Sequence, residues 1–257
     1  MLNAGNSLDY LKMPQGMAYG WWAFHEQWLE SLEFEVEIVS GDERSPGRYF
    51  QLYHGHVGTC GMYMGFQTDV QRPGMGGQGK GLIFSRWGTR DSADACPCAG
   101  GWVENGDHED GFVGVRSQFN WRLGRYQCWL GPTRTDAIGT WYEFRVDSLD
   151  SGEAGSAGSL RFPNSGTARA LIASGGGSWT EVYGSNCIRR ESIPPTHLTV
   201  RITANNGALR PCRCDTSYND SFTDADCFVS PDDLLHLISG HGVVRTHAGQ
   251  SSELLRR

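Results

Sequence analysis

Nine tryptophans and nine tyrosines are the most informative side chains in this 257-residue sequence. Their rings combine an apolar face with a polar edge, so they can stack on a sugar ring while neighbouring side chains hydrogen-bond its hydroxyls. Large β-sandwiches also bury such rings, and core packing is the expected role of most of them. The rings that we single out as candidate ligand-binding residues are Trp102, Trp179 and Tyr183.

Acidic residues offer a second kind of chemistry. A glycoside hydrolase needs two carboxyl groups about 5 Å or about 6.5–9.5 Å apart, on either side of the scissile bond. Glu104 begins an acidic loop that ends at Asp110, and Glu143 follows two aromatic residues on a predicted strand. Glu104 and Glu143 are the catalytic candidates if the protein is a glycan-active hydrolase or lyase; the alternative is a solvated acidic loop. That loop could also bind calcium weakly, and no other cofactor is expected.

Histidines and cysteines could bind a metal ion. His54 and His56 are two residues apart on a predicted strand and therefore share a face, but the sequence identifies no third ligand. Three histidines near the C-terminus, His236, His241 and His247, have spacings that favour no single coordination geometry. A pair of solvent-facing histidines is the alternative interpretation of 54 and 56, and no metal is the main expectation.

Eight cysteines in a glycine-rich, lysine-poor sequence predict disulfides and an extracellular location. They are Cys60, Cys96, Cys98, Cys128, Cys187, Cys212, Cys214 and Cys227. The sequence does not choose among the possible pairings. Two alternatives stay open: zinc bound by the two Cys-x-Cys pairs at 96–98 and 212–214, or reduced buried thiols.

Several other function classes are excluded. The segment 74–80 has the spacing of a phosphate-binding loop, but Gly81 lacks the hydroxyl for magnesium and a strand follows, so we expect a hairpin loop. There is no Gly-x-Ser-x-Gly nucleophile motif. With 22 basic and 29 acidic residues and no basic face, nucleic acid is not an expected partner. No apolar run approaches the ~20 residues of a membrane-spanning helix.

The elements that must position these residues are predicted to be strands. Residues 33–39 alternate strictly, with Phe34, Val36 and Ile38 on one face and glutamates on the other, which is typical of a half-buried strand. Residues 18–32 fit a helix or a strand. Further strands are predicted at 48–54, 62–68, 81–87, 112–116, 125–130, 140–146, 159–162, 179–183 and 197–203.

Many short strands with turns between them predict an all-β fold, an antiparallel two-sheet β-sandwich of the jelly-roll, concanavalin-like type, over residues 1–205. Residues 206–257 are predicted to be a cysteine-containing C-terminal extension. One short helix is expected there, because Ser230-Pro-Asp-Asp233 resembles a helix N-terminus, Leu234, Leu237 and Ile238 form a stripe, and Gly240 can end the helix.

Four segments in the middle of the chain are rich in glycine and aromatic residues: 63–67 (YMGFQ), 82–88 (LIFSRWG), 111–116 (GFVGVR) and 139–144 (GTWYEF). With them, residues 18–205 resemble a family of secreted bacterial domains catalogued as a domain of unknown function. The resemblance implies a β-sandwich similar to concanavalin-like lectins and, by association with carbohydrate-active and cell-surface modules, glycan binding. It implies no catalytic residues. The cysteines and residues 210–257 depart from the family pattern.

Together these observations predict a secreted, non-enzymatic β-sandwich that binds a glycan or another cell-surface ligand. The first alternative is a glycan-active enzyme that uses paired carboxylates. The second is a self-assembling structural or toxin-like protein. The sequence leaves the ligand and the oligomeric state open.

Overall fold

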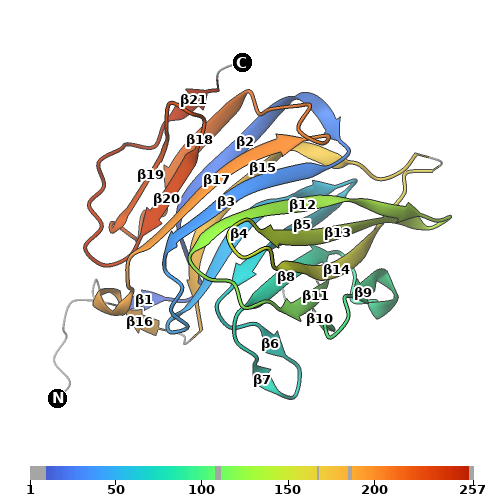
Figure 1. Ribbon diagram of the computed structural model, residues 1–257, viewed down its shortest axis with the longest axis horizontal. Coiled ribbons are helices and arrows are strands. Elements are labelled where there is room, and N and C mark those ends of the chain that lie inside the picture. Colours follow the sequence, from blue (N-terminus) through green and yellow to red (C-terminus); the bar gives the residue numbers. More distant parts are fainter. Residues whose placement is uncertain (1–9, 108–110, 167, 185–186, 255–257) are drawn as a thin grey trace.

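The protein folds into two large antiparallel β-sheets packed face to face, which confirms the predicted β-sandwich (Figure 1). The computed structural model describes residues 10–107, 111–166, 168–184 and 187–254. The first sheet has nine strands. In hydrogen-bonded order they are β10 (Trp102–Gly106), β11 (Phe112–Gln118), β8 (Gly81–Trp87), β5 (Cys60–Gln67), β4 (Gly47–Val57), β15 (Ile172–Tyr183), β2 (Gln15–Leu29), β18 (Arg213–Tyr218) and β21 (Ser251–Glu253).

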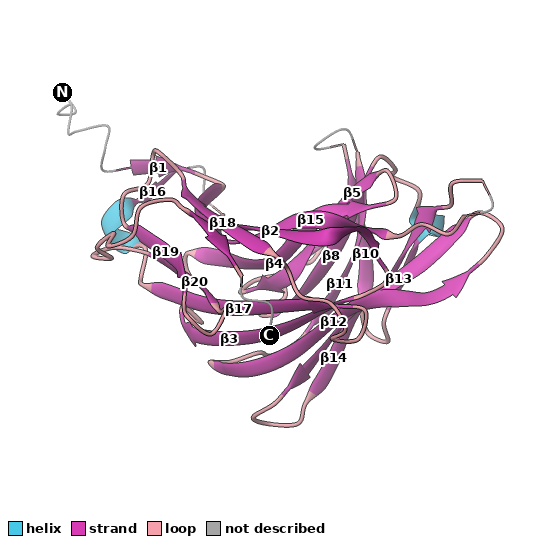
Figure 2. Ribbon diagram, turned by 90° about the horizontal axis from the view of Figure 1, so that it is seen from above, coloured by secondary structure: helices cyan, strands magenta, loops and turns pink. Residues whose placement is uncertain are grey.

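The second sheet has eight strands. In order they are β19 (Ala225–Val229), β20 (Leu235–Ser239), β17 (Thr196–Ala204), β3 (Leu32–Ser40), β12 (Gly124–Thr135), β13 (Gly139–Ser148), β14 (Ala154–Pro163) and β9 (Ala95–Pro97). Two small sheets pair β1 (Tyr10–Lys12) with β16 (Cys187–Arg189) and β6 (Gln71–Arg72) with β7 (Gly76–Gly77). Figure 2 shows the two large sheets as layers of the sandwich.

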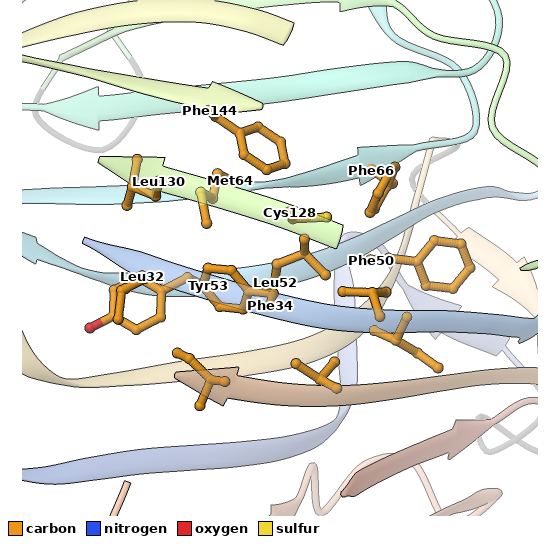
Figure 3. Close-up of a cluster of buried hydrophobic side chains, with 14 of the residues drawn as sticks. Leu32, Phe34, Phe50, Leu52, Tyr53, Met64, Phe66, Cys128, Leu130 and Phe144 are labelled. Atoms are coloured by element: carbon orange, nitrogen blue, oxygen red, sulfur yellow. The ribbon is translucent and has the colours of Figure 1, made fainter. Parts of the chain in front are cut away.

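The core lies between the two sheets and is built by side-chain alternation. On β3 the predicted pattern holds, because Phe34, Val36 and Ile38 are buried while the glutamates between them point to the other side. Figure 3 shows Phe34 among core side chains from both sheets, including Tyr53 of β4 and Cys128 of β12. Each sheet therefore has one face in the core and one outer face.

The predicted C-terminal helix is wrong, because Leu235–Ser239 is strand β20, paired with β17 and β19. Ser230–Asp233 closes a turn, with the amide of Asp233 donating to the carbonyl of Ser230. Leu235 and Leu237 alternate into the core, so sheet pairing and burial outweigh the helix-start signals. In the described residues the helical elements are short 3-10 turns, at Ser92–Asp94 and Arg190–Ser192 among them, and none is long and apolar enough to cross a membrane.

Two other parts of the chain are also resolved as strands. The segment 18–32, which fits helix or strand by its sequence, belongs mostly to the long strand β2. The last 50 residues add β18 and β21 to the nine-stranded sheet and β19 and β20 to the eight-stranded sheet. The strands after residue 205 are therefore part of the two large sheets, and the structure shows no separate extension that begins at the predicted boundary.

The predicted disulfides are absent, because no two of the eight cysteines, all of which lie in the described part of the chain, are joined. Cys128, Cys214 and Cys227 are buried, and burial raises the pKa of each thiol. These three side chains fill space in the core as small apolar groups. The Cys-x-Cys pairs cannot share a zinc ion, since Cys96 lies on edge strand β9 of one sheet and Cys214 on β18 of the other.

Candidate functional site

The candidate site is a row of aromatic rings on the outer face of the nine-stranded sheet. We call it the ring strip: Tyr63, Trp87, His54, Trp179, Tyr19 and Trp21, from strands β5, β8, β4, β15 and β2. The ring centroids of Tyr63 and Trp87 are 5.2 Å apart, and those of Trp87 and His54 are 5.0 Å apart. The centroid of Trp179 is 5.1 Å from that of His54 and 5.6 Å from that of Tyr19. Trp21 is 5.9 Å from Trp179. The rings thus form one continuous surface across five adjacent strands.

Two glycines leave room for two of these rings next to the backbone of the sheet. A Cβ atom at Gly61 would come within 2.4 Å of the Trp87 ring, and one at Gly177 within 2.7 Å of the Trp21 ring. The two rings therefore occupy the space next to the glycine backbone. Trp21 is 40% exposed, and the other five rings are partly exposed. Tyr19 and Trp21 are nearly parallel, at 15°, whereas the other neighbouring rings are tilted by 38–63° to one another, so a ring-shaped ligand would meet both faces and edges of the rings.

A β-bulge brings His54 into the strip. On β4, Phe50, Leu52 and Tyr53 all pack in the core, and the register of the strand shifts between Gln51 and Tyr53. Regular alternation would place Tyr53 outside and His54 inside. The extra residue reverses this, so that Gln51 and His54 both lie on the outer face.

Buried polar atoms without partners lie at the centre of the strip. The hydroxyl of Tyr49, Nε2 of Gln51 and Nε1 of Trp179 are buried and accept or donate no hydrogen bond. Gln51 is 3% exposed and directly opposite Trp179 in the pairing of β4 with β15. Buried polar groups are nearly always satisfied in folded proteins, so these atoms are candidates for contact with solvent or a ligand, as are the buried atoms without partners on Ser85 and Arg86.

The carboxylate of Glu181 adds negative charge to this centre. Glu181 lies opposite Tyr49 in the sheet. Burial raises the pKa of Tyr49, the charges of Tyr63 and Glu181 raise it further, and Arg116 opposes them. Burial also raises the pKa of Tyr19, where a hydrogen bond with Asn219 lowers it and Glu181 raises it. Both tyrosines are therefore neutral hydrogen-bond donors beside an acidic group at neutral pH.

Two of the three predicted ligand-binding residues lie beside the strip instead of in it. Trp102 is 7% exposed and packs against Tyr49, Val70 and Ile83, and its indole nitrogen donates to the carbonyl of Gln71 at 2.9 Å. The hydroxyl of Tyr183 donates to the carbonyl of Asp69 at 3.0 Å. These contacts hold the loop 69–80 at the edge of the site, and Trp179 alone of the three contributes to the strip.

The two predicted catalytic acids lie on opposite sides of the sandwich. Glu104, on β10 of the nine-stranded sheet, is 2.9 Å from Nε of Arg116. Glu143, on β13 of the eight-stranded sheet, is bonded to Arg145 and Ser156. They cannot flank one scissile bond, and each is already paired within its own sheet.

The predicted metal sites gain no further ligands. His54 and His56 share the outer face of β4, as expected from their spacing, but His54 packs between Trp87 and Trp179 while His56 is exposed. Among the described residues, no three or more histidine, cysteine or acidic side chains gather as metal ligands. Residues 108–110 of the acidic loop considered for calcium lie outside the described part of the chain.

Most residues of the ring strip were not predicted from the sequence, although a local signal for this part of the sheet exists. Tyr19 and Trp21, Tyr49 and Gln51, and Trp179 and Glu181 are each two residues apart on one strand. Such pairs share a face. What the spacing does not show is that the three strands are neighbours.

Comparison with known proteins gives a distant structural similarity. No family model and no curated protein matches the chain. One solved structure of scytalido-glutamic peptidase, with a peptide-based transition-state analogue, has a TM-score of 0.44 and 14% identity over 89% of this chain and 100% of that one. A second, with a transition-state analogue inhibitor, has a TM-score of 0.44 and 11% identity over 90% and 100%. At this distance neither an activity nor a residue role carries over.

Proposed function

We propose that this protein is a non-enzymatic recognition module that binds a glycan chain along the ring strip. The observation that carries the proposal is the unbroken row of rings across β8, β5, β4, β15 and β2. The centroid distances from Trp87 through His54 and Trp179 to Trp21 limit the length of the row to about 16 Å. This length suits several consecutive sugar rings better than a single small molecule.

The polar groups support the same ligand class. A sugar ring offers an apolar face for stacking and hydroxyl and ring oxygens around its edge. Nε2 of Gln51, Nε1 of Trp179 and the hydroxyl of Tyr49 are donors without partners, and because they are buried, sugar oxygens reach them only when the covering rings move. The extracellular location expected from the sequence stays part of the proposal, although the eight cysteines form no disulfides.

Affinity electrophoresis against a panel of soluble polysaccharides tests this proposal. We expect retardation on at least one polysaccharide, reduced by Trp179→Ala or Trp21→Ala. Trp129→Ala is the matched control, because Trp129 lies on the outer face of the other sheet, stacked with Arg145. Migration unchanged on every polysaccharide would contradict glycan binding, and equal retardation of all three variants would contradict the placement of the site on the ring strip.

The two alternative functions are less well supported. A paired-acid hydrolase needs a second carboxylate near Glu181, but Glu104 on β10 is ion-paired with Arg116, and four strands lie between β10 and β15. Self-assembly through the strip predicts a concentration-dependent dimer. Light scattering of the unmodified protein and of Trp21→Ala separates this case, because a dimer lost in the variant would assign the strip to a second copy of the chain.

A further inference from the structure

A pair of histidines lies on the outer face of the eight-stranded sheet, on the side of the sandwich opposite the ring strip. Nε2 of His197 on β17 is 3.1 Å from Nδ1 of His236 on β20. In the sheet Thr199 is directly opposite His236, so His197 is its diagonal neighbour two residues away. The hydrogen-bonded register of two antiparallel strands therefore fixes the separation of the two backbones.

Aromatic stacking holds one of the two imidazoles in place. The ring of Phe228 on β19 is nearly parallel to that of His236, with centroids 4.5 Å apart and an interplanar angle of 8°. Its ring also stacks with His247, at 4.2 Å. Nδ1 of His247 is 3.0 Å from a carboxylate oxygen of Asp226, which is buried. Stacking with Phe228, which itself stacks with His247, thus restricts the orientation of the His236 ring.

We propose that His197 and His236 chelate one divalent transition-metal ion of the Zn²⁺ or Cu²⁺ class. Two nitrogens bound to a tetrahedral ion by bonds of 2.0–2.1 Å are about 3.3 Å apart, which is close to the observed separation. Imidazole nitrogen is a favourable ligand for both ions. The terminal torsion of histidine is broad, so a small rotation of each ring can direct both lone pairs at the ion at little cost.

Protons and charge are accounted for without a further reactant. Without the ion, one ring carries a proton on the nitrogen that faces the other ring; on binding, that proton moves to the outer nitrogen of the same ring, and both facing nitrogens become ligands. Water fills the remaining coordination positions. The carboxylates of Asp232 and Glu37 favour a cation at His236, but His247 opposes them, and Asp232 is also paired with Arg201 at 3.2 Å.

Titration calorimetry of the whole chain with ZnCl2, in a buffer that does not bind zinc, tests the site. We expect saturable binding of one ion per chain, weakened at least about tenfold by His197→Gln and by His236→Gln. His56→Gln is the control, since His56 belongs to the other sheet and to the alternative histidine pair. Absence of saturable binding would overturn the proposal, as would loss of binding only in His56→Gln.

A second measurement covers the case in which a variant fails to fold. Electron paramagnetic resonance of the unmodified protein with one equivalent of Cu²⁺ should show hyperfine coupling to two imidazole nitrogens. Coupling to fewer than two nitrogens would contradict the chelate. The two proposals can be told apart, because glycan retention does not depend on this site. Zinc binding can fail while the ring strip still binds polysaccharide, and glycan binding can fail while the histidines still bind zinc.

Discussion

The two outer faces of the sandwich carry aromatic rings from the same kind of strand alternation, but the rings have different neighbours. On the nine-stranded sheet the rings contact one another, and buried donors beside them have no partner. On the eight-stranded sheet Trp129 stacks with Arg145 at 5.0 Å, and Trp141 lies between Arg134 and Arg161, at 4.2 and 5.4 Å. There the guanidinium groups occupy the ring faces that a ligand would need.

The charged groups differ in the same way. On the eight-stranded face Arg201 pairs with Glu35 and Asp232, and Arg145 with Glu143. These described groups of that face are paired with one another, whereas on the other face Gln51 and Trp179 each have a buried atom without a partner. The comparison teaches that a count of surface rings does not locate a binding site; what matters is whether the protein itself already occupies them.

The largest expected effect is loss of ligand affinity in Trp179→Ala. Trp179 contacts three other rings of the strip and contributes one of the unpaired donors. Truncation of such a central ring should cost about 2 kcal/mol of binding, roughly a thirtyfold increase in Kd for the polysaccharide found by electrophoresis. Trp129→Ala should leave Kd unchanged, and an equal loss in both variants would erase the distinction between the two faces.

The acid dependence of stability should come from the eight-stranded side. Burial raises the pKa of Asp226, but hydrogen bonds from Thr246, His247 and Tyr218 outweigh it and lower the pKa to about 2. A depressed pKa stabilises the fold above the unfolded value of about 3.9, and this stabilisation, about 2 kcal/mol, is lost as pH falls from about 4 to about 2. Urea unfolding at pH 7 and pH 2.5 should show this loss in the unmodified protein and less of it in Asp226→Asn. An identical pH dependence in Asp226→Asn would contradict the assignment.

A smaller effect is expected from Gly177→Ala, which adds a methyl group beneath the Trp21 ring without removing the ring. The new Cβ would lie 2.7 Å from Trp21 and 3.4 Å from Trp179. Trp21 is exposed enough to move, so the variant should fold with a melting temperature close to normal, while a tilted ring costs about 1 kcal/mol of binding, roughly fivefold in Kd. Gly175→Ala, at a glycine of β15 where the added Cβ would meet only the carbonyl oxygen of Trp22 at 3.7 Å, controls for substitution itself. Unchanged affinity in Gly177→Ala would show that binding does not depend on the position of the Trp21 ring.

The smallest effect is expected from Tyr49→Phe, and its sign should differ between binding and stability. Removal of a buried hydroxyl without a partner should leave the free energy of unfolding unchanged or slightly higher. If the ligand satisfies that hydroxyl, binding should weaken by about 1 kcal/mol. Tyr126→Phe is the control, because its hydroxyl bonds to the backbone of Arg122 and its loss should lower stability without affecting Kd. Unchanged affinity in Tyr49→Phe would remove this hydroxyl from the site.

Much of the sheet structure could be predicted from the sequence, and most of the site could not. Phe34, Val36 and Ile38 reveal their strand because alternation is a property of consecutive residues. The signals at Ser230–Asp233 are also local, but Leu235 and Leu237 pair with a strand more than 30 residues away, and that pairing decided the structure. The cysteine count predicted disulfides that the arrangement of the strands does not form.

The sequence by itself determined that this chain alternates apolar and polar residues over short segments. Each such strand must therefore bury its apolar face, which a two-sheet sandwich allows. Only the tertiary structure decided that Tyr19, His54, Trp87 and Trp179 meet, because the order and register of strands depend on pairings between residues far apart in the chain. A single extra residue in β4 then decided that His54 lies outside and Tyr53 inside.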